Sequence, residues 1–321
     1  MARRLAAVLA VVSILVLGCS TEDGDRPARQ RTEPLGDDAH ASGGPPPTGV
    51  VVPKTPLPAP EDPATSTEGR PYRGYPDAVA VLGGSDATGR GSDPARPGID
   101  VRENSWATGS NPQVASVFLR LVARHPDADG HAIDLARDRA TLDDLHGQAR
   151  SLVALQPPDP LVVLQPIGEG LDCPASRADL DRFEEQLRAT LDEIDDGLPT
   201  SRIFVVTRFG SSRPYVGSTG PARRVTVPGT GRCVTADAHG RVLPRGVARR
   251  GAAERAYGRR LARSCAAVPR CADDRGALTA TRVRPSYVDA RRGCLSVRGE
   301  AAEAAVAWRS MRAAGLLPAR R

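Results

Sequence analysis

Short apolar segments alternate with helical segments from Ala78 onward, and this alternation constrains the fold of the chain more than any other feature. The apolar segments are too short for helices and read as buried strands. The expected strands are residues 78–82, 131–135, 161–164 and 202–207, and the expected helices are residues 112–125, 141–155, 176–194, 245–267 and 297–314. Strands separated by helices favour a parallel sheet covered on both faces. We therefore expect one α/β domain with a central parallel sheet that helices cover on both faces.

Two helix starts and one irregular stretch complete this expectation. Asn111 is expected to cap the helix that begins at Pro112, since proline suits the first helical position. Ser176 and Asp179 have the spacing of a capping pair at the start of another helix. Residues 210–244 are rich in Gly, Pro and Ser, and we expect them to be irregular.

Residues 1–19 have the three parts of an export signal. Arg3 and Arg4 precede an apolar stretch that is shorter than the roughly 20 residues needed to span a bilayer, so it indicates a signal peptide rather than a membrane helix. The closing Val-Leu-Gly-Cys19 resembles the lipobox of bacterial lipoproteins. That resemblance implies lipidation at Cys19, export, and anchoring to the outer face of the cell membrane. The alternative is an ordinary secretory signal with a chance cysteine.

Residues 20–75 form a separate region that is rich in Pro, Gly and Thr and has few large apolar side chains. Such a segment buries too little surface to offset the entropy of ordering, so we expect a disordered tether. Its proline runs would keep it locally extended. The folded domain is then expected over residues 76–321.

The positive charge of the chain is almost entirely arginine. Lys54 is the single lysine among 44 basic residues, and the net charge is +6. This usage, with abundant Ala, Gly and Pro, is typical of a GC-rich genome such as that of an actinobacterium. The basic excess lies mostly beyond residue 200, where it could attract anionic lipids or wall polymers, or could be a solvated surface that reflects the arginine bias. Nucleic acid is not an expected partner, because the chain is exported and aromatic residues are scarce.

Five cysteines follow Cys19, and an oxidising compartment favours disulfides among them. An odd number leaves one thiol over. No Cys-x-x-Cys pair or Cys/His cluster has the spacing of a zinc site, so we expect no metal and no cofactor.

Ser85 is the first candidate for chemistry. It follows the first expected strand in the turn Gly83-Gly84-Ser85, and ligands of parallel α/β sheets bind at the carboxyl ends of strands. A serine there can be a nucleophile, with backbone N–H groups free to bind an oxyanion. A serine in a glycine turn can equally be only a turn residue.

The segments around this turn resemble the actinobacterial branch of the SGNH, or GDSL, hydrolases. The segments that carry the resemblance are residues 81–91, 103–109, 140–145, 167–170 and 295–299. The resemblance implies a three-layer α/β/α fold with a central parallel sheet, of the flavodoxin-like type. It also implies hydrolysis of esters, with Ser85 as the nucleophile.

The other catalytic positions that the resemblance implies are degenerate. Gly84 stands where the family has Asp before the nucleophile, and Arg139 stands at the glycine whose N–H holds the oxyanion. Gly170 replaces the asparagine that donates to the oxyanion. Arg291 and Cys294 replace the final Asp and the general-base His. A serine hydroxyl is a weak nucleophile without an adjacent base.

By the same resemblance, we expect disulfides Cys173–Cys233 and Cys265–Cys271. Cys294 is then the expected leftover thiol, either a small buried hydrophobe or a thiolate beside arginines.

Three functional hypotheses follow. The preferred one is an inactive hydrolase-like lipoprotein that binds an acylated glycan, a lipid or an envelope protein. The alternative is an active serine esterase that uses Ser85 with an unrecognised general base, for which His239 is the least implausible residue. The third is a structural or assembly role without a ligand.

Overall fold

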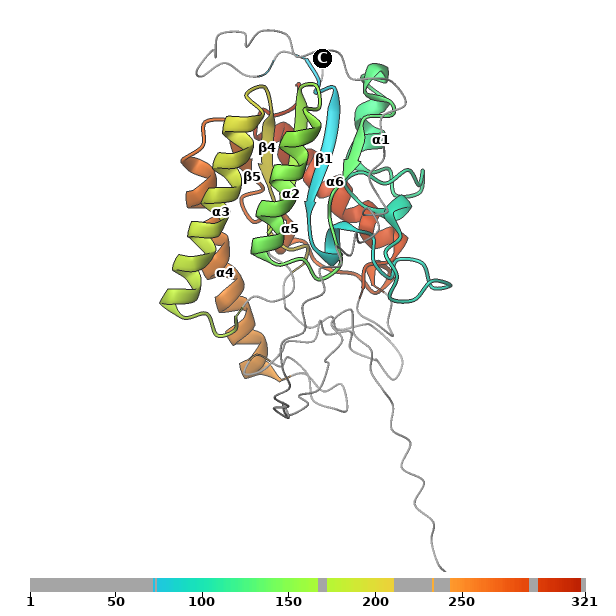
Figure 1. Ribbon diagram of the computed structural model, residues 1–321. Coiled ribbons are helices and arrows are strands. Elements are labelled where there is room, and N and C mark those ends of the chain that lie inside the picture. The colour runs from blue at the N-terminus through green and yellow to red at the C-terminus, as the bar shows by residue number, and fades with distance from the viewer. Residues whose placement is uncertain are drawn as a thin grey trace, which may run out of the picture.

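The computed structural model describes Tyr72, Cys233 and residues 74–166, 172–210, 243–288 and 294–318. A parallel sheet of five strands forms its centre, in the order β2-β1-β3-β4-β5 (Figure 1). The strands are β1 (Ala78–Gly83), β2 (Ala132–Asp134), β3 (Pro160–Gln165), β4 (Arg202–Val205) and β5 (Cys271–Asp273). This strand order is that of flavodoxin-like sheets, so the predicted fold class is confirmed.

Helices cover both faces of the sheet, with α2 in front of it and α6 behind it in Figure 1. The helices are α1 (Val117–Val122), α2 (Leu142–Leu155), α3 (Arg177–Gly197), α4 (Pro244–Ala266), α5 (Ala277–Ala280) and α6 (Val297–Ala313). Two cores result, one on each face. Leu152, Leu187 and Leu261 pack with Leu82 on one face, and other side chains, such as Leu121 and Trp308, pack with Val79 on the other.

The predicted capping pair at α3 is present. The Ser176 hydroxyl accepts the N–H of Asp179, and the Asp179 carboxylate accepts the N–H of Ser176. Thr141 and Asp144 form the same reciprocal pair at α2. These contacts satisfy N–H groups that the first helical turn leaves without partners.

The helix predicted over residues 112–125 is wrong in its first half. Ala115 has a φ of 46°, which interrupts helical geometry, and α1 begins only after Ser116, its N-cap. Asn111 instead accepts the N–H of Gln113 within a turn. Strand β5 was not predicted, because Cys271–Asp273 is too short and too polar to show a strand pattern.

The folded part includes residues that we assigned to the tether. Tyr72 and Tyr75 pack against the core, and the Arg202 guanidinium lies 4.5 Å from the centre of the Tyr72 ring and donates to the Gly74 carbonyl at 2.9 Å. Contacts of the folded part thus extend at least to Tyr72. The predicted signal peptide, Cys19 and most of the predicted tether lie outside the described residues, as does nearly all of the stretch 210–244. None of the described helices is long and apolar enough to cross a bilayer.

Candidate functional site

The turn that carries Ser85 is fixed by the end of β1. The Gln148 side chain on α2 accepts the N–H of Gly83 at 2.8 Å and donates to its carbonyl at 3.1 Å. A Cβ at Gly83 would lie 3.2 Å from the Cβ atoms of Ala87 and Gln165, so glycine allows the close approach of these neighbours. The chain then enters a short 3-10 turn, Ser85–Ala87, at the carboxyl edge of the sheet.

The Ser85 hydroxyl is occupied in both of its hydrogen-bonding roles. Its Oγ donates to Oδ1 of Asp138 at 2.7 Å and accepts the backbone N–H of Arg139 at 3.0 Å. Ser85 as a whole is only 5% exposed. Arg139 has a φ of 57°, which places this N–H in a tight left-handed turn. The donor that the resemblance assigned to the oxyanion therefore binds the nucleophile itself.

Asp138 belongs to a charged network. Arg90 pairs with Oδ2 of Asp138 at 2.8 Å and with Asp100 at 3.4 Å. Thr88 donates to Asp100 at 3.0 Å and so closes the network on the turn after Ser85. The Asp138 carboxylate therefore accepts from Ser85 through Oδ1 and pairs with Arg90 through Oδ2 at the same time.

Among the described residues, no histidine hydrogen-bonds to Ser85. His125 and His131 contact Asp77, at the opposite end of β1, with N···O distances of 2.6 Å and 3.2 Å. The six residues of β1 put roughly 20 Å between these imidazoles and the serine turn. His146 lies on α2, and its buried Nδ1 has no hydrogen-bond partner among the residues that the structure describes. His40 and His239 lie outside the described residues.

The remaining degenerate positions divide into two groups. Gly84 and Cys294 are described, whereas Gly170 and Arg291 lie outside the described residues.

Cys294 is buried and disulfide-bonded, so the predicted leftover thiol is wrong. No cysteine in the described part of the chain is free. A disulfide sulfur carries no titratable proton, so Cys294 cannot act as a thiolate or as a base.

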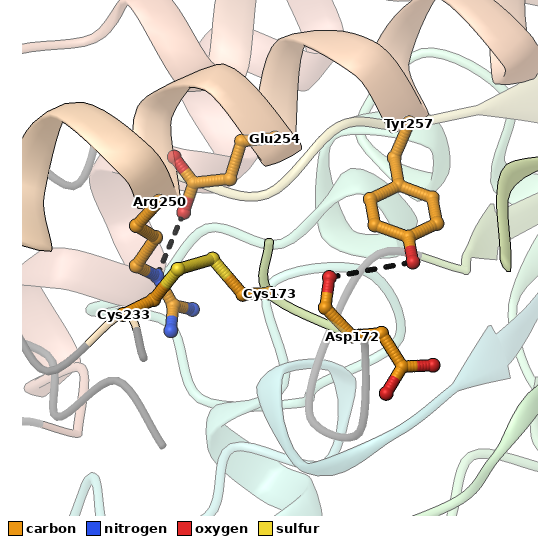
Figure 2. Close-up of a disulfide and its surroundings, with 6 residues drawn as sticks. All are labelled: Asp172, Cys173, Cys233, Arg250, Glu254 and Tyr257. Atoms are coloured by element: carbon orange, nitrogen blue, oxygen red, sulfur yellow. Dashed lines mark hydrogen bonds and ion pairs between the residues drawn. A yellow bond between two sulfur atoms is a disulfide. The ribbon is translucent and has the colours of Figure 1, made fainter. Parts of the chain in front are cut away.

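Both disulfides that the resemblance implied are present. Cys173–Cys233 and Cys265–Cys271 have Cα–Cα distances of 5.7 Å and 5.2 Å. Figure 2 shows the first bond beside the Arg250–Glu254 ion pair on α4. It also shows the hydroxyl of Tyr257 directed at the carbonyl of Asp172, to which it donates at 3.4 Å. Burial raises the pKa of Tyr257 to about 12, so this hydroxyl stays a neutral donor.

A cavity of about 190 Å³ opens beside the serine turn, between α2, α3 and α4. Gly83 and Gly84 form its border with that turn, and Gln165 and Pro166 close it at the end of β3. The charged side chains that line it in the described part of the chain are three carboxylates and one guanidinium, Asp143, Asp172, Asp179 and Arg182. Two of the carboxylates are already engaged, since Asp143 accepts from Gln186 at 2.5 Å and Asp179 caps α3. The position matches that of ligand sites in parallel α/β sheets.

Sequence reasoning missed Asp138, Gln165 and two buried glutamates of α6, Glu300 and Glu303. Asp138 gave no signal, because its role depends on a turn that a local pattern does not show. Glu300 and Glu303 did give a sequence signal. They lie one turn before Ala304 and Ala307, on the apolar face of the helix, where charged residues are unusual. No group of His, Cys, Asp or Glu side chains in the described ranges could hold a metal ion.

Comparisons with known proteins concern the fold. No family model matches the chain, and no curated protein is significantly similar to it. Its fold is similar to that of TesA, with 12% sequence identity, coverage of 74% of this chain and 98% of TesA, and a TM-score of 0.44. It is also similar to that of phospholipase A1 from Streptomyces albidoflavus NA297, with 11% identity, coverage of 73% of this chain and 99% of that chain, and a TM-score of 0.45. For an extracellular lipase from Streptomyces rimosus, the identity is 14%, the coverage is 74% of this chain and 99% of that chain, and the TM-score is 0.42. At these identities the similarity concerns the arrangement of helices and strands alone, so the site is interpreted from its own contacts.

Proposed function

We propose that this chain is a lipid-anchored protein of the bacterial cell envelope whose SGNH-like domain binds a ligand without hydrolysing it. The observation that carries the proposal is the double engagement of the Ser85 hydroxyl, by Asp138 and by the N–H of Arg139. An attacking serine needs a base to take its proton and a donor left free for the oxyanion. Here the nearest acceptor is tied to Arg90, and the nearest donor is used by the serine itself.

The anchoring half of the proposal rests on the sequence. The lipobox-like Val-Leu-Gly-Cys19 follows a charged start and an apolar stretch, as in bacterial lipoproteins. Acyl chains on Cys19 would bind the domain to the outer face of the membrane, at about 0.8 kcal/mol per buried methylene.

The cavity between α2, α3 and α4 is the proposed ligand site. It lies at the carboxyl edge of the sheet, next to the serine turn, and is lined both by apolar side chains such as Phe183 and by charged side chains such as Arg182. Candidate ligands are an acylated glycan, a lipid or a segment of an envelope protein.

One observation favours a second candidate function, that of a serine esterase. The Ser85–Asp138 distance of 2.7 Å is short enough for a carboxylate to act as the general base. Against it stand the ion pair that holds Asp138 to Arg90 and the N–H of Arg139, which donates to Ser85 Oγ and so is not free for an oxyanion.

Three measurements test the proposal. Cys19→Ala should move the protein from the membrane fraction of a lipoprotein-processing bacterial host to the medium. The purified domain should not hydrolyse a chromogenic short-chain ester above the rate of Ser85→Ala. Thermal shifts with phospholipid micelles and O-acetylated oligosaccharides should reveal binding that Arg182→Glu, at the cavity, weakens more than the matched Arg188→Glu on the same helix. Hydrolysis that Ser85→Ala abolishes would establish the esterase instead.

A further inference from the structure

Two carboxyl groups are buried where α6 packs beneath the strand ends. Glu300 and Glu303 are 1% and 0% exposed and lie one turn apart on the helix. Within the described ranges, neither forms an ion pair with an Arg or a His. A carboxylate buried without a cation is costly, and such a group normally becomes neutral instead.

Their contacts connect α6 to two other parts of the domain. Glu300 Oε2 accepts the backbone N–H of Trp106 at 3.1 Å, and Glu303 Oε1 accepts the side-chain N–H of Gln165 at 3.0 Å. The Trp106 indole N–H donates to Gln165 Oε1 at 3.3 Å, so that Trp106 and Gln165 link the two glutamates through hydrogen bonds. Gln165 is the last residue of β3 and also lines the cavity.

One carboxyl oxygen of the two glutamates takes no part in these hydrogen bonds. Glu303 Oε2 is buried, and it has no hydrogen-bond partner in the described part of the chain. An ionised oxygen in this place would lack any compensation for the water that it lost. We therefore place the proton of the neutral Glu303 carboxyl group on Oε2.

The charges around the pair act mostly in the same direction. Burial raises the pKa of both glutamates well above the ordinary glutamate value, and the negative charge of Asp86, next to Ser85, raises both further. Glu300 adds to this effect on Glu303. The Arg208 guanidinium, which follows β4, opposes it only in part, because Arg208 already pairs with Asp86 at 3.4 Å. Behind Arg208, Arg250 pairs with Glu254 on α4.

We propose that Glu300 and Glu303 form a proton-dependent clamp. In the neutral form they hold α6 against the turn of residues 103–109 and against the end of β3. When a carboxyl proton leaves to solvent, the new negative charge repels the other carboxyl group and Asp86, and the clamp loosens at the border of the cavity. The proposal does not depend on whether the domain binds a ligand or hydrolyses an ester.

Hydrogen exchange of the full chain, followed by mass spectrometry at several pH values, tests the clamp. After correction for intrinsic rates, protection of the amides of residues 103–109 should fall about tenfold or more between about pH 5 and about pH 9, which corresponds to one unit or more of difference in pKa. The double variant Glu300→Gln, Glu303→Gln should keep its protection across this range, because the two glutamine side chains have no carboxyl proton to lose. Glu185→Gln, the same change at an exposed position of α3, should behave as the unaltered chain does.

Either of two results would contradict the clamp. Protection in the unaltered chain that does not change with pH would overturn the clamp, even if the Gln variants failed to fold. A double variant that folds and still loses protection with rising pH would overturn it as well.

Discussion

The hydroxyl of Ser85 donates a hydrogen bond to Asp138, and the Asp138 carboxylate is itself paired with Arg90. This relationship places the serine in a network of hydrogen bonds and ion pairs. The same Oγ accepts the N–H of Arg139, so the residue that looks like a surviving nucleophile uses its donor and an acceptor site to hold two turns together.

Asp138→Asn tests whether this network is structural. The amide keeps an oxygen for Ser85 but removes the negative charge that balances Arg90, so we expect the free energy of unfolding to fall by about 1.5–3 kcal/mol. Urea denaturation measures this change. Asp127→Asn, at an exposed carboxylate on the surface, should change stability by less than about 0.5 kcal/mol. Equal effects of the two variants would contradict the structural role of Asp138.

Most of the fold could be predicted from the sequence, because its signals are local. The apolar runs of β1 and β3 and the caps Ser176 and Thr141 each follow from a few adjacent residues. The start of α1 could not be predicted, because the left-handed backbone of Ala115 overrides a helical pattern that looks continuous. Strand β5 has too few residues to carry a pattern.

The site was predictable only in part. Ser85 and the carboxyl edge of β1 follow from the glycine turn and from the rule for ligand sites in parallel sheets. Asp138, which lies 53 positions from Ser85, meets it only because the turn after β2 folds back over the end of β1. Contacts of this kind depend on tertiary packing, which no local spacing encodes.

Two glycines should respond oppositely to alanine. A Cβ at Gly109 would lie 2.5 Å from the carbonyl oxygens of Glu103 and Ser105, so Gly109→Ala should cost about 2–3 kcal/mol in unfolding free energy. Gly147 lies on α2 with open space around the added atom, so Gly147→Ala should stabilise the protein by about 0.5–1 kcal/mol. Thermal unfolding of both variants measures the difference. A Gly109→Ala variant that is as stable as the unaltered chain would contradict the close approach at Gly109, and a destabilised Gly147→Ala variant would contradict the open space at Gly147.

The Cys173–Cys233 and Cys265–Cys271 disulfides should differ in the stability that they provide. Cys173 and Cys233 are separated by 60 positions in the sequence, and Cys265 and Cys271 by only 6. Loop-closure entropy predicts losses of about 4 kcal/mol and about 2 kcal/mol when each pair is replaced by alanines. Chemical denaturation of the two double variants measures both losses. The reverse order would mean that effects in the native state outweigh the restriction of the unfolded chain.

Asp134 should make stability fall with rising pH. Burial, only partly offset by the Arg102 ion pair at 2.8 Å, raises the pKa of Asp134 from its ordinary value of 3.8 to about 6. Between these values the folded chain keeps a proton that the unfolded chain releases. The free energy of unfolding should therefore drop by roughly 2–3 kcal/mol as the pH rises through this interval, and this contribution should level off above it.

Denaturation at a series of pH values measures this dependence, and Asp134→Asn should remove it. Carboxylates whose pKa is lowered by their contacts, such as Asp144 and Asp179, act in the opposite direction at lower pH, so the difference between the two proteins isolates Asp134. A difference that stays constant with pH would show that this carboxyl group does not hold its proton in the fold.

The central claim is that Ser85 is not an activated nucleophile, and its reaction with a fluorophosphonate tests that claim most directly. Such a reagent forms a covalent adduct with a serine whose proton is removed by a base. Intact-mass spectrometry of the chain after prolonged exposure should show no adduct beyond the level found with Ser85→Ala. A stoichiometric adduct that maps to Ser85 and is lost in Ser85→Ala would contradict the account.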